Sequence, residues 1–563
     1  MSVSQRDIRA LVLYHLREGC FERATAEVDD FVRKRGSDPV LAFWRAVAQG
    51  FNGNIGGCIR ELDMLRQRRD TELAVTFALR HFHRMSVNVD LDAVDALDAA
   101  LPLAEESASD AARVLAVEWL GLRALDSSEA RRIASAIVDG PGRGGATPVQ
   151  LHAGVALGWA ELQARIVKES DLKRRRQCLE YFTDELLDRD LNALMGRAMF
   201  HVLHGSSVGG SQRALEALNT AVGFASWFTP ALVEQAKVFM GYNDWDSAQD
   251  TVDRILSEKA GEMSALRLGA LIAVLRGTDP AHTRGVLMDL LASMRATEGG
   301  NAALIGTTAA TLSRVANTDA NLQDLIGAFF EVARKAAEGS GQAGGAGASM
   351  ALEAEQQLLL GNYRMAGEMY NRAVAADEGD TAAMYGLIWC QALEGSVEDA
   401  AQQLEFLSVV GHGTGGSDDG GAMLPFLAAV VAWRGAGAGG GRDEAAHVRL
   451  LIEAYEKHMR QVKRFRRGDV YTYYRVLNPA FLYALARELL FHAAEAAANL
   501  GEGVGLSQVP ESVRLGLDIL QRTLAVAPAM TDAHLLLART RLTLGQLEAA
   551  QAAAAAAAAS APR

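Results

Sequence analysis

A repeat of 34 residues constrains this chain more than any other feature. Gly361 recurs as Gly395 and Ala366 recurs as Ala400, each 34 positions later. In both copies the small residue is followed by apolar residues four and seven positions further on, a spacing that keeps them on one stripe of a helix. A glycine can end a helix because it tolerates a left-handed backbone, and a small residue lets two helices approach closely. The pattern therefore predicts repeated pairs of α-helices.

The same spacing fits distant parts of the chain, and it is typical of tetratricopeptide repeats, which are helix–turn–helix units of this length. We therefore expect an all-α, right-handed superhelical solenoid, in which each helix pair buries its apolar face against its neighbours. Such a solenoid has a concave groove that binds peptides or other subunits. The residues expected to define the repeats are Gly19, Ala24, Gly53, Cys58, Ala214, Trp245, Ala248, Gly361, Ala366, Gly395, Ala400, Gly545 and Ala550.

The composition is compatible with a helical protein that has a buried core. Apolar residues make up 49% of the 563 residues and charged residues 22%, which is too apolar for a disordered chain. The net charge of −13 argues against nucleic acid as the main partner. Four widely spaced cysteines are expected to be buried thiols of a reducing compartment. No apolar run is long enough for a secretory signal or a membrane span, so we expect a soluble intracellular protein without a direct membrane span.

Glycine-rich stretches suggest how the array is divided. We expect an N-terminal repeat array over residues 1–338, a Gly/Ala-rich loop over 339–349 and a continuing repeat array over 350–563. Two further glycine-rich breaks, at 411–421 and 435–441, are also expected to be loops. None of the three glycine-rich stretches ends in the Lys-Ser/Thr pair of a phosphate-binding loop, so a nucleotide cofactor is not expected. The chain is expected to stop at a repeat boundary, with more of the array beyond it, because the last repeat offers no polar cap.

No group of residues in the sequence indicates catalysis or metal binding. His81 and His83 are two positions apart and would face different sides of a helix. His201 and His204 could share a face, but no cysteine or carboxylate at ligand spacing accompanies them. The sequence also lacks the hydrolase and zinc-protease motifs. We therefore expect a non-catalytic protein with no catalytic residue, cofactor or metal.

One segment departs from the repeat composition and is the expected place of partner contact. It combines basic and aromatic residues, which are Arg460, Lys463, Arg464, Arg466, Arg467, Tyr471, Tyr473 and Tyr474. Basic residues interleaved with aromatic ones can bind nucleic acid. The alternative is structural, since cations are favoured at a helix C-terminus and the tyrosines can pack between repeats.

Several short stretches resemble the tetratricopeptide repeat protein 21 family, the long tetratricopeptide-repeat subunit of intraflagellar transport complex A. The matching motifs are Gly36-Ser37-Asp38-Pro39, Arg84-Met85-Ser86-Val87-Asn88-Val89-Asp90, Asp244-Trp245-Asp246, the run from Cys390 to Leu407, Leu477-Asn478-Pro479 and the run from Ala533 to Ala538. These motifs are distributed over nearly the whole chain. The glycine-rich stretches and the basic residues Arg174–Arg176 depart from the family pattern, so no contacts are carried over there.

The resemblance implies a non-catalytic scaffold subunit that supports retrograde ciliary transport and the ciliary entry of membrane cargo. Its partners would be other subunits of the A complex and train components, with membrane-protein cargo bound indirectly and no nucleic acid. The expected location is the cytoplasm, the cilium or flagellum, and its base.

Two other classes of function remain open at this point. A peptide-binding cochaperone or adaptor outside the cilium would need a Lys/Asn/Arg carboxylate clamp on consecutive first helices. The stretches 41–50 and 381–393 lack that combination. An enzyme with an appended repeat array would require a domain outside this chain.

Overall fold

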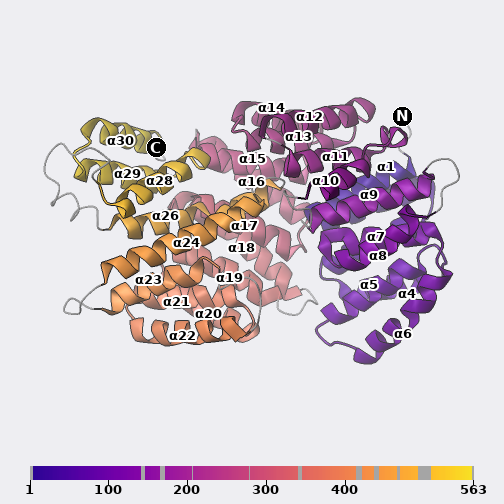
Figure 1. The fold of residues 1–563 in the computed structure, drawn as a ribbon, viewed down its shortest axis with the longest axis horizontal. Coiled ribbons are helices and arrows are strands. Elements are labelled where there is room, and N and C mark those ends of the chain that lie inside the picture. Colours follow the sequence, from indigo (N-terminus) through magenta and orange to yellow (C-terminus); the bar gives the residue numbers. More distant parts are fainter. Residues whose placement is uncertain are drawn as a thin grey trace. The chain divides into compact units, whose positions relative to one another are not determined.

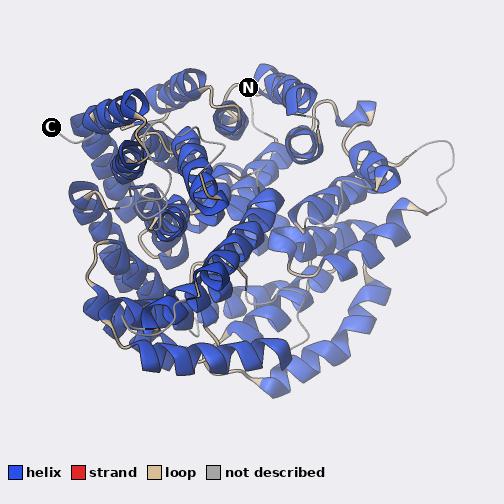
Figure 2. Cartoon of the chain, turned by 60° about the vertical axis from the view of Figure 1, so that its left-hand side comes forward, coloured by secondary structure: helices blue, strands red, loops and turns tan. Residues whose placement is uncertain are grey.

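The fold is described from a computed structural model. It describes residues 4–140, 146–164, 171–205, 207–277, 279–316, 318–339, 345–413, 421–436, 443–465, 469–491 and 509–560. Within these ranges the regular elements are helices and no strand occurs (Figure 2). The prediction of an all-α repeat fold is therefore confirmed, while the handedness of the superhelix stays a prediction.

The helices belong to two compact units. Unit 1 comprises Met1–Ala265, Ser293–Leu304 and Lys335–Ala343. Unit 2 comprises Leu266–Ala292, Ile305–Arg334 and Gly344–Arg563. These units follow the packing of the helices, whereas the division expected at 339–349 follows the order of the chain.

In unit 1 most helices pack on the next one along the chain, whereas α7 packs on α5 and not on α6 (Figure 1). We call the odd-numbered helices up to α13 first helices and the even-numbered ones up to α14 second helices. The helices are α1 (Gln5–Glu18), α2 (Phe21–Arg35), α3 (Pro39–Phe51), α4 (Ile55–Leu65), α5 (Glu72–Met85), α6 (Leu91–Ser107), α7 (Asp110–Gly121), η1 (Leu122–Ala124), α8 (Ser127–Val138), α9 (Pro148–Gln163), α10 (Leu172–Glu180), η2 (Glu185–Leu187), α11 (Leu191–His204), α12 (Ser207–Phe224), α13 (Thr229–Gly241) and α14 (Trp245–Glu258).

Four helices contribute residues to both units, and the remaining ones belong to unit 2. The four are α15 (Met263–Arg276), α16 (Pro280–Thr297), α17 (Ala302–Ala316) and α18 (Ala320–Gly339). Those of unit 2 are α19 (Gly345–Leu359), α20 (Tyr363–Ala376), α21 (Thr381–Glu394), α22 (Val397–Gly413), α23 (Met423–Gly435), α24 (Glu444–Phe465), α25 (Val470–Leu477), α26 (Pro479–Leu490), α28 (Glu511–Val526), α29 (Thr531–Thr543) and α30 (Leu547–Ser560).

The ends of the helices follow from local chemistry. Asp38 caps α3 by accepting hydrogen bonds from the backbone N–H groups of Val40 and Leu41, both at 2.9 Å, and Pro39 occupies the first helical position. At the end of α21, Gly395 has φ 98°, the left-handed conformation that glycine adopts without strain. The turn between two helices is thus fixed by residues that the sequence repeats.

Glycines inside helices mark places where two helices approach closely. A Cβ atom added at Gly386 of α21 would lie 2.3 Å from the ring of Tyr370 on α20. The tyrosine ring therefore fills the space that a side chain at position 386 would need. This contact belongs to the repeat that first revealed the 34-residue period.

The Gly/Ala-rich stretch 339–349 is corrected by the structure. Helix α18 extends to Gly339 and α19 begins at Gly345, so the part 345–349 is helical and not a loop. The physical reason is packing, because a Cβ atom at Gly347 would lie 3.1 Å from the Cβ atom of Ala376 on α20. The glycines at 345–349 therefore allow α19 to pack closely on α20, and they do not interrupt α19. The predicted glycine-rich breaks at 411–421 and 435–441 lie largely outside the described residues.

All four cysteines are buried and free of disulfides, as expected for compact apolar side chains. None of the helices among the described residues combines the length and the hydropathy needed to cross a membrane.

Candidate functional site

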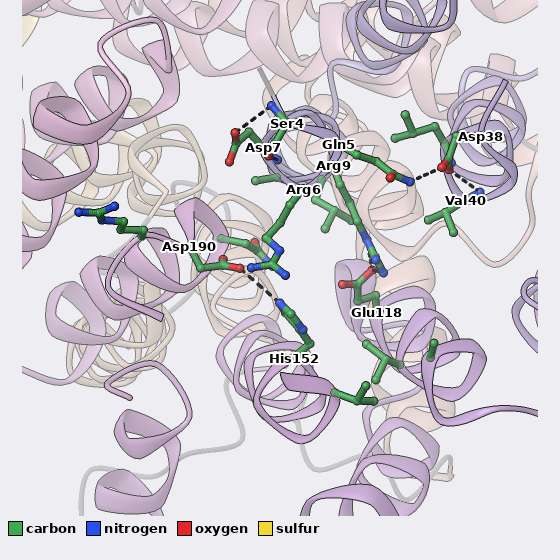
Figure 3. Close-up of a pocket in the computed structure, with 18 of the residues that line it drawn as sticks. Ser4, Gln5, Arg6, Asp7, Arg9, Asp38, Val40, Glu118, His152 and Asp190 are labelled. Carbon is green, nitrogen blue, oxygen red and sulfur yellow. Dashed lines mark hydrogen bonds and ion pairs between the residues drawn. The ribbon is translucent and has the colours of Figure 1, made fainter. Parts of the chain in front are cut away.

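Five of the first helices of unit 1 line a groove with a volume of about 720 Å³. We call it the first-helix groove (Figure 3). It lies where α1, α3, α7, α9 and α11 meet, beside the end of α12, and its apolar part includes Leu13, Leu41 and Val114. Its polar lining residues are Ser4, Gln5, Arg6, Asp7, Arg9, Asp38, Glu118, His152, Arg189, Asp190 and Asn192.

Three helix N-termini open on this groove. Ser4, Asp38 and Asp190, which cap α1, α3 and α11, all line it. Ser4 forms a capping box with Asp7, whose carboxylate accepts the Ser4 N–H at 3.1 Å. Because helix N-termini carry partial positive charge, they stabilise the carboxylates placed there. The acidic residues of the groove thus have a structural role.

Neighbouring side chains also engage the carboxylates of the groove. Arg9 donates to Glu118 across α1 and α7, with its Nε atom 3.0 Å from Oε2. Gln5 donates to Asp38. Figure 3 shows Arg6 pointing from α1 toward Asp190. Each of these carboxylates therefore accepts at least one hydrogen bond or interacts with at least one cation inside the protein.

The surroundings of Asp190 in the groove stabilise the ionised form of its carboxyl group. Burial raises the pKa of its carboxyl, but His152 at 3.6 Å, the N–H of Ala193 and the charge of Arg6 outweigh burial. The pKa of Asp190 therefore lies below its usual value, and the carboxylate is ionised at neutral pH.

Two arginines of the groove remain available to a ligand. Arg6 and Arg189 are exposed, and neither forms a hydrogen bond with another residue that the structure describes, although the charge of Arg6 acts on Asp190. Each guanidinium presents five N–H donors in a fixed geometry that fits carboxylates. The groove can thus hold a polar chain that carries acceptor groups. Among the residues described, no cluster of three or more His, Cys, Asp and Glu side chains could hold a metal ion.

The residues that the sequence marks as repeat-defining lie at equivalent places in the helix pairs. Gly19, Gly53, Gly361, Gly395 and Gly545 have φ angles between 72° and 98° in turns. The small-residue positions Ala24, Cys58, Ala214, Ala248, Ala366 and Ala400 have no exposed surface, and Ala550 is 6% exposed. Trp245 begins α14 and is half-buried. These positions hold the repeats together and do not line the first-helix groove.

The basic and aromatic segment of unit 2 differs from the expected partner contact. Tyr471 and Tyr474 are buried, with 6% and 3% of their surface exposed, which agrees with the structural alternative for this segment and not with partner contact at these two residues. Tyr471 donates to the backbone oxygen of Arg267, whose guanidinium lies 4.1 Å from the centre of the tyrosine ring. Tyr474 donates to the backbone oxygen of Val526 at 3.2 Å. These tyrosines pack between helices because their rings are apolar and their hydroxyls find backbone acceptors.

The rest of that segment lies at the surface or outside the described side chains. Arg460 and Lys463 are exposed on α24, and Tyr473 is half-buried. The side chain of Arg464 and both Arg466 and Arg467 lie outside the described residues. Partner contact at Arg460 and Lys463 stays a prediction.

Sequence reasoning missed the first-helix groove. Its residues come from six helices far apart in the chain and the turns before them, and no single motif contains them. A usable signal existed in the capping residues, since Ser4, Asp38 and Asp190 each precede a first helix. Caps at the start of stacked first helices are expected to gather along one side of a repeat array.

Stacked helix pairs with a groove along their first helices define this chain as a helical repeat protein. Two family models match it in succession, the tetratricopeptide repeat protein 21 N-terminal ARM repeat over residues 12–249 and the tetratricopeptide repeat protein 21 second ARM domain over residues 285–560. The chain belongs to the tetratricopeptide repeat protein 21 family, and the resemblance inferred from its short sequence motifs is confirmed.

Individual relatives agree with this assignment. The chain is 26% identical over 556 residues to human tetratricopeptide repeat protein 21B, covering 97% of this chain and 39% of that relative. It is 28% identical over 558 residues to mouse tetratricopeptide repeat protein 21A, covering 98% and 39%. The chain thus spans about two fifths of the length of these relatives.

Among solved structures, the crystal structure of the APC/C hetero-tetramer Cut9–Hcn1 matches at 12% identity, covering 100% of this chain and 95% of that chain. Its TM-score is 0.30, so this likeness carries no conclusion about the present chain.

Proposed function

We propose that this chain is a non-catalytic scaffold subunit of the intraflagellar transport A complex. It supports retrograde ciliary transport and the ciliary entry of membrane cargo through contacts with other proteins. The observation that carries the proposal is the succession of two tetratricopeptide repeat protein 21 models over residues 12–249 and 285–560. Its partners are other subunits of that complex and train components, and its place is the cytoplasm, the cilium and the ciliary base.

The first-helix groove supports a scaffolding role. Its carboxylates are engaged in caps and pairs, whereas Arg6 and Arg189 keep their donors available. A partner segment that lies along the first helices can accept hydrogen bonds from both arginines and bury apolar side chains against the groove. Binding of this kind requires no catalytic group.

The test is affinity purification of the tagged full chain from ciliated cells, followed by mass spectrometry. We expect stoichiometric recovery of intraflagellar transport A subunits. A matched pair of variants addresses the groove, with Arg6→Glu and Arg189→Glu against Arg284→Glu and Arg539→Glu, which replace exposed arginines outside it. The groove pair is expected to lose at least one partner and the control pair none. Recovery of no train subunit by the unmodified chain would contradict the proposal.

A peptide-binding adaptor outside the cilium is the second candidate. The observation that favours it is the pair of available arginines in the groove, which suits an acidic or C-terminal carboxylate. Recovery of chaperones without train subunits in the same experiment would select this candidate.

A further inference from the structure

Unit 1 carries a cluster of exposed cations that the first-helix groove does not include. It lies at the C-terminal end of α2 and directly after α4, and we call it the basic edge. Its residues are Arg33, Lys34, Arg35, Arg66, Arg68 and Arg69. All are exposed except Arg66, which is half-buried. Residues 33–37 and 66–70 contain these six cations and one acid, Asp70, so their net charge is +5, in a chain whose total is −13.

The two halves of the basic edge lie side by side. Arg45 of α3 donates to Asp29 of α2 and to Glu61 of α4, both at 3.1 Å. Because α2 and α4 both pack against α3 and are joined to it by short turns, they run in the same direction. With a rise of about 1.5 Å per residue, each basic segment begins about one turn beyond this shared bridge.

The periodicity of the chain places the same charges in register. Lys34 and Arg68 are separated by 34 positions, as are Arg35 and Arg69. Equivalent positions of consecutive repeats stack along an array. The basic edge is therefore a feature of two neighbouring repeats and not of one helix end.

A general preference of cations for helix C-termini does not account for this cluster. Among the second helices of unit 1, α2 has basic residues in its last turn, whereas α4, α6, α8, α10, α12 and α14 have none there. Helix α6 instead ends with Glu105 and Glu106 close to its last residue. Arg66 is the C-cap residue of α4, whereas Arg68 and Arg69 lie beyond the helix and are not part of its last turn.

Few cations of the basic edge form ion pairs with the acidic residues that the structure describes. Lys34 pairs with Asp30 at 2.6 Å, but both side chains are largely exposed, at 70% and 46%. Arg35 lies over the ring of Phe31, with the guanidinium carbon 5.7 Å from the ring centre. Within the part of the chain that the structure describes, Arg33, Arg66, Arg68 and Arg69 have no ion-pair partner. Four guanidinium groups at this edge are thus free to bind an external anion.

We propose that the basic edge binds an acidic segment of a partner protein, a run of aspartate and glutamate residues that spans the ends of α2 and α4. Charge complementarity identifies the occupant, because guanidinium groups bind carboxylates through paired hydrogen bonds. The spacing of two stacked repeats favours an extended chain with several carboxylates. This surface is distinct from the first-helix groove, and the proposal does not depend on the ciliary role.

The test uses the full chain and a fluorescein-labelled peptide of alternating glutamate and glycine. Fluorescence anisotropy is expected to show binding that weakens strongly when the salt concentration rises from about 0.05 M to about 0.3 M, because screening acts on exposed charges. The same peptide with lysine in place of glutamate should not bind. Binding of the glutamate peptide that is independent of salt would overturn the proposal.

Variants locate the binding site. Arg33→Glu with Arg35→Glu, and separately Arg68→Glu with Arg69→Glu, should each weaken binding of the glutamate peptide at least about tenfold. The control, Arg284→Glu with Arg539→Glu in unit 2, makes the same change of charge at exposed positions and should leave binding unchanged. Combining the four edge substitutions should produce a chain that binds the lysine peptide. Equal loss in the control would overturn the assignment to this edge.

Two further probes distinguish an acidic protein segment from other anions. Vesicles of phosphatidylcholine with phosphatidylserine, and a single-stranded oligonucleotide, are measured against the same variants. Weaker binding of both than of the glutamate peptide supports the proposal. If the vesicles or the oligonucleotide bind more tightly than the glutamate peptide, and the edge variants weaken that binding, the ligand of the basic edge is that anion. This result would overturn the proposal.

Discussion

The basic edge of unit 1 and the basic segment of unit 2 resemble each other in composition but not in structure. At the edge, cations of two stacked repeats lie at the surface around the bridge made by Arg45. In unit 2, Tyr471 and Tyr474 turn inward and bond to backbone oxygens. The difference teaches that an unusual composition in one stretch can reflect packing, whereas charges that recur with the repeat period gather at one surface.

The largest expected effect tests the packing of the unit 2 segment. Replacing Tyr474 by alanine removes a buried ring and its hydrogen bond to Val526, so we expect a loss of about 3–5 kcal/mol in the free energy of unfolding. Tyr473→Ala, at a half-buried position, should cost clearly less. Chemical denaturation of both variants measures this. A Tyr474→Ala chain as stable as the unmodified one would show that the ring acts at the surface after all.

Each unit contains a buried histidine, and the two histidines can be compared through the dependence of stability on pH. Burial lowers the pKa of His15 in α1 to about 4, and neither ring nitrogen bonds to any residue that the structure describes. Burial also lowers the pKa of His458 in α24, but its Nε2 atom lies 2.9 Å from the backbone oxygen of Leu477, which counteracts the shift.

Because the unfolded state binds a proton at His15 more readily than the folded state, stability falls as pH decreases. The loss begins near the unfolded pKa of about 6.5 and is complete below about 4, and it amounts to roughly 3 kcal/mol. His15→Leu should flatten the dependence of stability on pH in this window, as followed by denaturation at several pH values. An unchanged slope in the variant would assign the acid sensitivity to other groups.

Removing the ion pairs of Arg45, which link α2 and α4 beneath the basic edge, should have a smaller effect on the free energy of unfolding. Arg45 is about one third exposed, with 35% of its side chain accessible, so water screens its two ion pairs. Arg45→Ala is expected to lower the free energy of unfolding by about 1 kcal/mol. A double-mutant cycle with Glu61→Ala should show a coupling of a few tenths of a kcal/mol or more. Strict additivity would mean that the bridge does not hold α2 and α4 together.

The smallest expected effect concerns the exposed cations of unit 2. Arg460→Ala combined with Lys463→Ala should change the free energy of unfolding by no more than about 0.5 kcal/mol, because both side chains are exposed. Affinity purification of this variant then reports on partner contact alone. Loss of a partner would support contact through α24, and an unchanged set of partners would remove this segment as a candidate.

The sequence by itself determined the repeat architecture and the family. The 34-residue period fixed which positions are small, and those positions are buried because two helices approach there. Local capping was equally readable, since Asp38 and Pro39 start α3 through contacts within a few residues. Such features depend on neighbours in the chain or on equivalent places in the next repeat, so the sequence displays them directly.

Only the tertiary structure decided how side chains from distant segments meet. Gly347 is part of a helix because α20 packs against it, although its neighbours read as a loop. Tyr471 is buried by a contact with Arg267, more than 200 positions away in the chain. The pairing of carboxylates in the first-helix groove likewise joins residues such as Arg9 and Glu118. Burial and pairing depend on three-dimensional neighbours, and a repeat period does not specify those neighbours beyond the adjacent helices.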